Sequence, residues 1–377
     1  MKIVVAPDSF KGSMEATHVA DLIAEEVRHA FPHSDVVALP LADGGEGSTE
    51  ALVSALSPDD EVDRSSTWVQ GPAGQEIIAD SAVIVPGIAL LEVAQSSGIT
   101  RQDSLHPMDS STYGFGQLIE SALDWGARDF LLCLGGSATT DAGCGMAHAL
   151  GVRFFADDEA PIVPCGQNLS RIARIDTSGL DQRVRQSTFI ALCDVVHPLY
   201  GTHGSAYVFG PQKGATAKQV RALDEGLCHI AERIRAIAPD ADPHTPGTGS
   251  AGGLGFGVQA FLGAELVSGS AYILDAVDFI SHVQGADLII TGEGRLDEQS
   301  FSGKVLSAIL REAGTVPVVS LCGSITCAPA ILAEHNVTAY ALSDGARIED
   351  CLADPETHLR KTVRRALTQR LLVRDEL

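Results

Sequence analysis

Basic side chains are scarce in this chain. Its 377 residues include 26 lysines and arginines against 49 aspartates and glutamates, so the formal net charge at pH 7 is −23. Proteins that bind nucleic acid or an anionic membrane need a basic face to neutralise phosphates. The composition therefore argues against both partners, but not against a small anionic substrate, which a few cations and backbone N–H groups can hold.

Long apolar runs and paired cysteines are also missing. No stretch of 18 apolar residues is present, so no membrane span is expected, and the short apolar run before Pro7 lacks the architecture of a signal peptide. None of the eight cysteines forms a C-x-x-C pair, which favours reduced thiols over disulfides or a zinc site. We therefore expect a cytoplasmic protein.

Common catalytic signatures are absent as well. Lys304 follows Gly303 but precedes Val305, so the sequence does not complete a Walker A motif. There is no G-x-S-x-G nucleophile elbow and no H-E-x-x-H metal motif. The chain is therefore not expected to be a P-loop enzyme, a serine hydrolase of the elbow type or a zincin.

Short β-branched segments gather at the two ends of the chain and predict five buried strands, separated by helix-length segments. They cover residues 2–8, 35–43, 286–294, 316–324 and 337–345. Strands in this βα order are typical of a doubly wound sheet. The residues in the middle of the chain, between these two groups of segments, show a different pattern of apolar and polar residues, with hairpin-like alternation over 66–85.

These patterns predict an α/β protein of two domains. Residues 1–60 plus 286–377 form a doubly wound domain with a five-stranded, parallel-type sheet, and residues 61–285 form a mixed α/β domain inserted into it. Residues 13–30 are expected to be a helix with Ser13 as its N-cap. Its apolar face comprises Val19, Leu22, Ile23 and Val27.

Five segments share one design, in which an apolar strand leads into a turn rich in glycine, acids or lysine. They are residues 4–13, 39–48, 131–143, 189–198 and 291–304. In α/β proteins the carboxyl ends of the strands form the ligand crevice. We therefore expect the acids at these strand ends, including Asp8, Asp43, Asp194 and Asp297, to lie near a ligand.

The positions of the lysines point to an anionic ligand. Only six of the 26 basic residues are lysine, and three of these adjoin glycine: Lys11, Lys213 and Lys304. A lysine ammonium is a flexible point charge that suits phosphate. The glycine-rich segment 246–257 follows polar residues rather than a strand, so it fails as a dinucleotide fingerprint, but a glycine loop opening a helix can bind an anion. These residues alone indicate an anion-handling α/β enzyme, for example a kinase that holds Mg²⁺ through oxygen ligands.

Seven motifs, spread over about residues 1–350, carry a resemblance to the bacterial glycerate kinases of the type-1 family. They are APDSFKGS, ADGGEGS, LGGSATTDAG, CDVVHPL, FGPQKGA, GSAGGLG and TGEGRLDEQSFSGK. The resemblance implies an active site in the cleft between two α/β domains, glycerate and ATP as small-molecule substrates, and Mg²⁺. It also implies 2-phosphoglycerate, rather than 3-phosphoglycerate, as the product. The chain departs from the family pattern at Thr140 and at Val196-His197, where asparagine is often found, and over residues 111–116 (STYGFG), where the family often has T-S-x-G-T-G.

The residue types and the resemblance together predict a role for each candidate site residue. The catalytic residues are Asp194 (first choice as general base), Asp297 (second choice) and Lys11. The substrate-binding residues are Arg295, whose guanidinium suits the glycerate carboxylate, together with Ser137, Gly136 and Glu293. The ATP-binding residues are Lys213, Gly252, Gly253 and Lys304, and the Mg²⁺ ligands are Asp8 and Asp43.

Two other functions fit parts of the pattern. A non-catalytic, two-domain sensor of a small hydroxy acid also has a cleft between domains, but it gains nothing from carboxylates beside an anion. A kinase of another hydroxy acid has the same requirements as a glycerate kinase. The sequence leaves the oligomeric state, the hydroxyl that is phosphorylated and the preferred enantiomer open.

Overall fold

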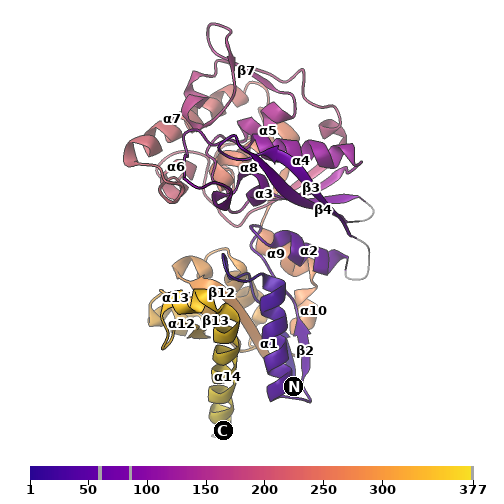
Figure 1. The fold of residues 1–377 in the computed structure, drawn as a ribbon, viewed down its shortest axis with the longest axis vertical. Helices are drawn as coiled ribbons and strands as arrows, with labels where there is room; N and C mark the ends of the chain where they lie inside the picture. The colour runs from indigo at the N-terminus through magenta and orange to yellow at the C-terminus, as the bar shows by residue number, and fades with distance from the viewer. Residues whose placement is uncertain (58–61, 85–86, 375–377) are drawn as a thin grey trace. The chain divides into compact units, whose positions relative to one another are not determined.

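The computed structural model describes residues 1–57, 62–84 and 87–374, which divide into two compact units (Figure 1). Unit 1 comprises Met1–Asp43, Glu50–Leu56 and Ser270–Leu377, and unit 2 comprises Gly44–Thr49 and Ser57–Gly269. The predicted domain boundary at residues 60 and 61 lies outside the described residues. Each unit has its own sheet and hydrophobic core.

Unit 1 is built on a five-stranded parallel sheet with the strand order β14-β13-β12-β1-β2. The strands are β1 (Lys2–Val5), β2 (Asp35–Ala38), β12 (Leu288–Leu296), β13 (Val318–Ile325) and β14 (Val337–Ala341). Both ends of the chain contribute, so the indigo N-terminal strands lie beside the orange C-terminal ones (Figure 1). The predicted doubly wound sheet is confirmed, and the change of direction in its strand order lies between β1 and β12.

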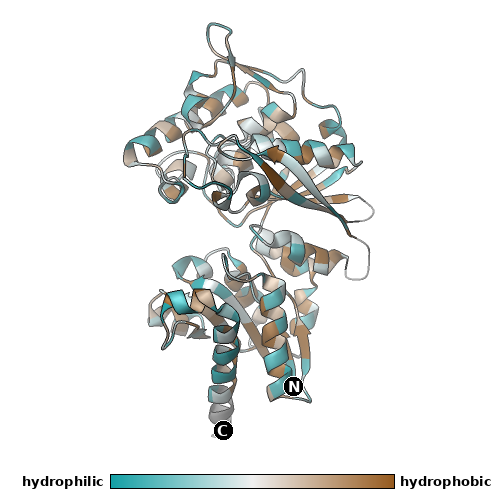
Figure 2. Cartoon of the chain, in the orientation of Figure 1, coloured by the Kyte–Doolittle hydropathy of each residue, from teal (hydrophilic) through white to brown (hydrophobic). Residues whose placement is uncertain are grey.

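Two helices cover one face of this sheet, α1 (Ala16–Ala30) and α14 (Pro355–Arg374). The four apolar residues predicted for the inner face of α1 are all buried, and they share a core with sheet residues such as Ile3 and Ile290 and with Leu359 of α14. Polar side chains cover the outer faces of both helices, as the teal colour shows (Figure 2). The period of the apolar residues therefore predicted which face of α1 is buried.

The predicted N-cap of α1 is wrong. The helix begins at Ala16 with Glu15 as N-cap residue. Ser13 instead lies in a tight turn in which Phe10 and Met14 pair, and its hydroxyl donates to the Phe10 carbonyl over 2.9 Å. Gly12, with φ of 81°, supplies the left-handed backbone that this turn requires.

The remaining helices of unit 1 are short and connect the strands. They are α10 (Phe279–Val283), the 3-10 helix η5 (Glu298–Phe301), α11 (Val305–Ala313), α12 (Pro329–Glu334) and α13 (Ile348–Ala353). Two more begin at the boundary with unit 2, α2 (Ser48–Leu56) and α9 (Gly269–Ala276).

Unit 2 contains a mixed six-stranded sheet with the order β11-β10-β6-β5-β4-β3. Its strands are β3 (Val62–Gln70), β4 (Glu76–Ile84), β5 (Ile88–Glu92), β6 (Asp129–Cys133), β10 (Thr188–Leu192) and β11 (Glu265–Val267). β3 and β4 form the antiparallel hairpin that the sequence predicts, whereas β5, β6, β10 and β11 are parallel. A smaller antiparallel sheet has the order β8-β7-β9, formed by Pro161–Ile162, Arg153–Phe155 and Arg174–Asp176.

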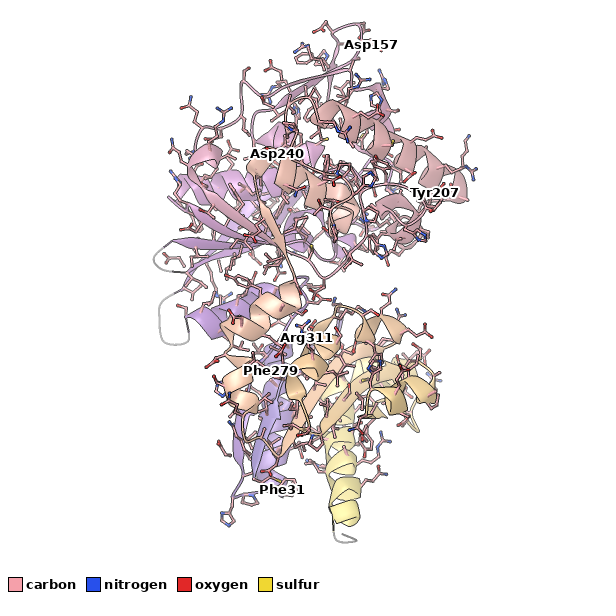
Figure 3. All side chains as sticks on the ribbon, turned by 180° about the vertical axis from the view of Figure 1, so that it is seen from behind. Phe31, Asp157, Tyr207, Asp240, Phe279 and Arg311 are labelled. Atoms are coloured by element: carbon pink, nitrogen blue, oxygen red, sulfur yellow. The ribbon has the colours of Figure 1, made fainter. Side chains whose placement is uncertain are left out.

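Helices surround the sheets of unit 2. They are α3 (Val93–Ser97), η1 (Ile99–Arg101), α4 (Tyr113–Asp124), α5 (Cys144–Ala149), η2 (Gly166–Arg171), η3 (Val184–Gln186), α6 (Ser205–Phe209), η4 (Pro211–Lys213), α7 (Ala217–Ile234) and α8 (Ser250–Leu262). Tyr207 projects outward from α6, and Asp157 lies at the tip of the turn that follows β7 (Figure 3). None of the helices in the part of the chain that the structure describes has the length and apolar character needed to cross a membrane.

Candidate active site

A pocket of about 350 Å³ opens in unit 1 at the carboxyl edge of the parallel sheet. All seven site residues predicted for unit 1 line it: Asp8, Lys11, Asp43, Glu293, Arg295, Asp297 and Lys304. The pocket lies where the strand order changes direction between β1 and β12, which is where open α/β sheets bind their ligands. The other six predicted residues belong to unit 2, so the prediction that the site lies between the domains stays a prediction.

Two aspartates and a lysine lie at one end of this pocket. Asp8 follows β1 and is buried, and the Lys11 ammonium contacts the Asp43 carboxylate over 2.9 Å. Burial, with a further contribution from the Asp43 charge, raises the pKa of Asp8 to about 8, although Lys11 opposes the shift. Asp8 is therefore largely protonated near neutral pH, and a cation that binds both carboxylates would favour its ionised form.

Glu293 and Arg295 lie on a strand rather than in a turn. The sequence predicts that the strand gives way to a turn near residue 294, but β12 continues to Leu296, with Glu293 paired to Cys322 and Arg295 to Ser324 of β13. Residues two apart on a strand share a face, and both side chains line the pocket. Pairing of β12 with β13 therefore places the Glu293 carboxyl and the Arg295 guanidinium side by side.

The Glu293 carboxyl is held in place by a hydroxyl. Ser300 Oγ donates to Glu293 Oε2 over 2.8 Å. Burial raises the pKa of Glu293 to about 7, while the Ser300 hydrogen bond and the Lys304 charge oppose that shift. Glu293 is therefore a second acid of this pocket that can hold a proton near neutral pH.

Asp297 has a structural role in this pocket wall. It is the N-cap of η5, where its Oδ1 accepts from Gln299 N over 3.0 Å, and its Oδ2 accepts from Arg295 Nε over 3.2 Å. The Arg295 side chain itself is 68% exposed. These contacts favour Asp297 as an anchor for Arg295, and leave the guanidinium accessible to a ligand.

In unit 2, Lys213 is buried beneath the loop after β6. Its ammonium donates to Ser137 Oγ over 3.1 Å and to the Thr139 carbonyl over 2.6 Å. Burial lowers the pKa of Lys213 to about 7, against the opposing charge of Asp141. Gly136, the neighbouring predicted residue, has φ of 81° and its carbonyl accepts from Ile99 N. Lys213 therefore stabilises the conformation of this loop.

Gly252 and Gly253 allow two segments of unit 2 to approach closely. They lie near the start of α8 with φ of 72° and 87°, and an added Cβ on Gly252 would lie 1.8 Å from the Thr139 carbonyl oxygen. The Gly252 carbonyl in turn accepts from Ala142 N over 3.1 Å. The sequence predicts that these glycines lie close to a ligand. In the structure Gly252 lies close to the backbone of Thr139 instead.

Asp194 follows β10, at the carboxyl end of the strand. Its Oδ1 accepts from Ser268 Oγ over 2.7 Å. Two of the positions at which the chain departs from the family pattern, Thr140 and His197, also belong to unit 2. Thr140 is buried, and His197 Nδ1 lies 3.0 Å from the His203 carbonyl oxygen.

Two buried acids of unit 2 were not predicted as functional residues. Asp141 accepts hydrogen bonds from the backbone N–H and the hydroxyl of Thr112, both over 2.8 Å, and from Gly143 N. Glu92 accepts from Thr49 N over 2.8 Å. Burial raises the pKa of both carboxyls. Asp141 could have been noticed in the sequence as an acid inside the motif SATTDAG, whereas Glu92 carries no such signal.

Comparisons with known proteins agree with this architecture. Residues 3–371 match the model of the glycerate kinase family. The chain is 41% identical over 342 residues to a glycerate kinase from Halalkalibacterium halodurans, with 89% of each chain covered. It is 38% identical over 344 residues to glycerate 2-kinase of Escherichia coli, covering 90% of this chain and 89% of the relative. A crystal structure assigned to glycerate kinase 2 of Salmonella typhimurium LT2 is 34% identical, covers 100% of both chains and superposes with a TM-score of 0.79. The resemblance found in the motifs is therefore confirmed, and the chain belongs to the glycerate kinase family.

Proposed function

We propose that this chain transfers the γ-phosphoryl group of ATP to glycerate in a Mg²⁺-dependent reaction that forms 2-phosphoglycerate. One observation carries the proposal: seven predicted acidic and basic residues line a single pocket at the carboxyl edge of the parallel sheet. Phosphoryl transfer depends on positioning and on charge neutralisation, and this pocket supplies residues for both. The name of the Escherichia coli relative, glycerate 2-kinase, supports the 2-hydroxyl as acceptor. We place the enzyme in the cytoplasm, where ATP is available and free thiols stay reduced.

The residues at one end of the pocket fit Mg²⁺. Mg²⁺ binds through one or two carboxylates and completes its shell with water and substrate phosphates. Asp8 and Asp43 supply two carboxylates, and the buried Ser9 hydroxyl has no hydrogen-bond partner among the described residues. Across residues 1–57, 62–84 and 87–374, no three His, Cys, Asp or Glu side chains form a complete metal cage. When bound, the ion would neutralise phosphate charge.

The other side chains of the pocket divide by charge and geometry. Lys11 and Lys304 supply positive charge for the phosphoryl group and for the ATP phosphates. The exposed Arg295 guanidinium suits bidentate binding of the glycerate carboxylate. Glu293 can accept from or donate to a glycerate hydroxyl, because it changes protonation near neutral pH.

The predicted contacts from unit 2 remain part of the proposal. Ser137 and Gly136 are assigned to substrate binding, and Lys213, Gly252 and Gly253 to the ATP phosphates. The burial of Lys213 and the packing of Gly252 favour an indirect role, in which they shape the loop that follows β6.

Asp194 is the proposed general base for the glycerate hydroxyl. Replacing it with asparagine should lower kcat by about 100-fold or more, because the amide cannot accept the proton. The measurement is steady-state kinetics on folded Asp194→Asn enzyme, with Ser268→Ala as the matched control that removes the hydroxyl donor and keeps the carboxylate. Near-normal kcat in Asp194→Asn would transfer the role to Asp297, the second choice.

The proposed reaction can be tested directly. ADP release is measured with D-glycerate, ATP and Mg²⁺, and the product is identified by ³¹P NMR, whose coupling pattern distinguishes 2- from 3-phosphoglycerate. We expect turnover on the order of 1–100 s⁻¹, as is usual for kinases. Absence of glycerate-dependent ADP release from the folded, Mg²⁺-supplied enzyme would contradict the proposed substrate.

A further inference from the structure

We propose that the unit 1 pocket binds the nucleoside of ATP against an apolar wall at the end opposite to its aspartates. This apolar wall is formed by Leu342, Ile348, Cys351, Leu352 and Pro355, all of which line the pocket. The inference deepens the proposed function and rests on it only in taking ATP as the phosphoryl donor.

Two side chains of the apolar wall are unusually exposed. Ile348 and Leu352, both on α13, are 55% and 60% exposed. They are four residues apart on a helix, so they lie on the same face. Contiguous exposed apolar side chains that border a pocket mark a binding surface, because water contact with them is unfavourable.

The strand order places the two ends of the pocket along one edge of the sheet. Asp8 follows β1 and Glu293 lies on β12, whereas Leu342 follows β14 at the other side of the sheet. Between them the pocket is lined by Gly294 of β12 and Gly323 of β13. Neither glycine has a side chain, so the path from the charged end to the apolar wall runs over backbone.

This polarity matches a nucleotide and does not match glycerate. All three carbons of glycerate carry oxygen, so glycerate has no apolar surface to pack against isoleucine or leucine. A nucleotide has a base with two apolar faces at one end and phosphates at the other. With its base against Ile348 and Leu352, its phosphates extend toward Lys304 and Lys11. The volume of about 350 Å³ lies within the range of small-molecule sites.

The test measures equilibrium binding of Mg-ADP by isothermal titration calorimetry, which requires no turnover. The double variant Ile348→Ser/Leu352→Ser should raise the Kd of Mg-ADP about 10-fold or more, because the base loses its apolar contacts. Its Kd for Mg-tripolyphosphate, which has no base, should change less than about twofold. Exposed apolar residues contribute little to folding, so the double variant is expected to stay folded.

The matched control is Ile280→Ser on α10. Ile280 is 54% exposed, in the same unit, and does not line the pocket, so Mg-ADP binding should stay at the wild-type value. In the active enzyme the double variant should raise KM for ATP and leave KM for glycerate unchanged.

The possible results separate the two proposals. Any one of three results would overturn the apolar wall as a nucleoside site. The wild-type enzyme does not bind Mg-ADP, or the double variant binds Mg-ADP with unchanged affinity. The third result is that the double variant loses equal affinity for Mg-ADP and for Mg-tripolyphosphate. If binding of Mg-ADP depends on Ile348 and Leu352 but glycerate is not phosphorylated, the nucleoside site stands and the proposed substrate fails. If the double variant turns over glycerate normally and binds Mg-ADP as wild type does, the proposed substrate stands and the nucleoside site fails.

Discussion

At the scale of single residues, two glycines with left-handed backbone differ in what surrounds them. Gly252 and Gly285 both have φ of 72°, but an added Cβ would meet the Thr139 carbonyl at Gly252 and nothing within 4 Å at Gly285. Gly285→Ala should therefore lower the free energy of unfolding only by the strain of a left-handed backbone at a residue with a Cβ, about 1–2 kcal/mol. Gly252→Ala adds a steric clash and should cost about 3 kcal/mol or more. Urea denaturation of the two variants measures the difference, and equal costs would contradict the close packing of Gly252.

Lys213 makes the stability of the protein depend on pH. Its pKa is about 7 in the folded protein, whereas an unfolded lysine titrates near 10.5. Between these values the unfolded chain binds one more proton, so folded wild type gains stability as pH rises, by up to about 1.4 kcal/mol for each pH unit. The Lys213→Met variant lacks this pH-dependent contribution to stability. Urea denaturation at pH 7.5 and 9.0 should therefore show wild type gaining about 2 kcal/mol over the variant; a difference independent of pH would contradict the buried, neutral lysine.

The sequence indicated which residues belong to the candidate site, but not which of their side chains are buried. Residue type and the adjoining glycine singled out both Lys304, which lines the pocket, and Lys213, which is buried. The two lysines look alike in sequence because burial depends on packing from distant segments. The contact of Lys213 with Thr139, 74 residues away, could not be inferred from its neighbours.

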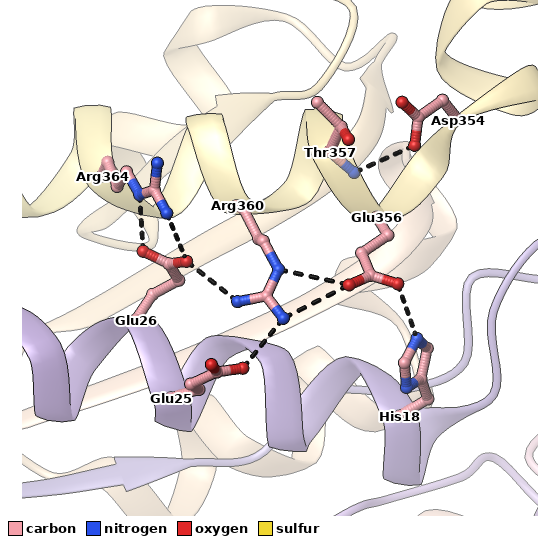
Figure 4. A network of polar contacts seen from close by, with 8 residues as sticks. All are labelled: His18, Glu25, Glu26, Asp354, Glu356, Thr357, Arg360 and Arg364. Carbon is pink, nitrogen blue, oxygen red and sulfur yellow. Dashed lines mark hydrogen bonds and ion pairs between the residues drawn. The ribbon is translucent and has the colours of Figure 1, made fainter.

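At the scale of elements, α1 and α14 are joined by a cluster of ion pairs (Figure 4). Glu26 of α1 is the buried member, with a side chain only 4% exposed, and it accepts from Arg364 over 2.6 and 2.8 Å and from Arg360 over 3.0 Å. Its neighbour Glu25 forms an ion pair with Arg360 over 2.8 Å and is 67% exposed. The hydrogen bonds to the two arginines hold the pKa of Glu26 below its usual value.

Replacing these two glutamates should therefore have unequal effects. Glu26→Ala should cost about 2 kcal/mol at pH 7, because it removes several charged hydrogen bonds, whereas Glu25→Ala should cost less than about 1 kcal/mol. Because the folded pKa of Glu26 is lowered, its contribution is complete above the unfolded value of 4.5 and is lost as pH falls through the lower folded value. Urea denaturation at pH 7 and pH 3.5 should show the Glu26→Ala penalty shrinking in acid; a constant penalty would show that packing, not charge, holds the helices together.

Periodicity predicted most elements, and errors arose where glycine was involved. The apolar face of α1 and the hairpin of β3 and β4 follow simple repeats, and both are confirmed. The C-terminal end of β12 was predicted two residues too early, at 294 instead of Leu296, because Thr291-Gly-Glu-Gly resembles a turn in sequence. In the structure, pairing with β13 keeps this segment extended, and such a partner cannot be identified from local propensity.

At the scale of the whole molecule, unit 2 has its own core and is nearly continuous in sequence. A fragment of residues 44–269 should therefore fold with a cooperative thermal transition. A shorter fragment of residues 57–269 lacks Thr49, whose backbone N–H donates to buried Glu92, and should be less stable by about 1–3 kcal/mol. Circular dichroism melting of the two fragments tests this prediction, and Glu92→Gln in the shorter fragment should recover part of the loss. Equal stability of the two fragments would contradict it.

Unit 1, by contrast, is assembled from the two ends of the chain. β1 pairs with β12 from Ile3 and Leu288 onward, so 285 residues separate the partners. At a translation rate of 5–20 residues per second, a ribosome needs roughly 15–60 s to deliver β12 after β1 has emerged. During that interval β1 can pair with β2, but its other edge, which pairs with β12, has no permanent partner, while unit 2 can already fold. We therefore expect that chaperone binding to this edge would protect the nascent chain against aggregation, and that the unit 1 pocket is completed only after its last lining residue, Pro355, has been synthesised.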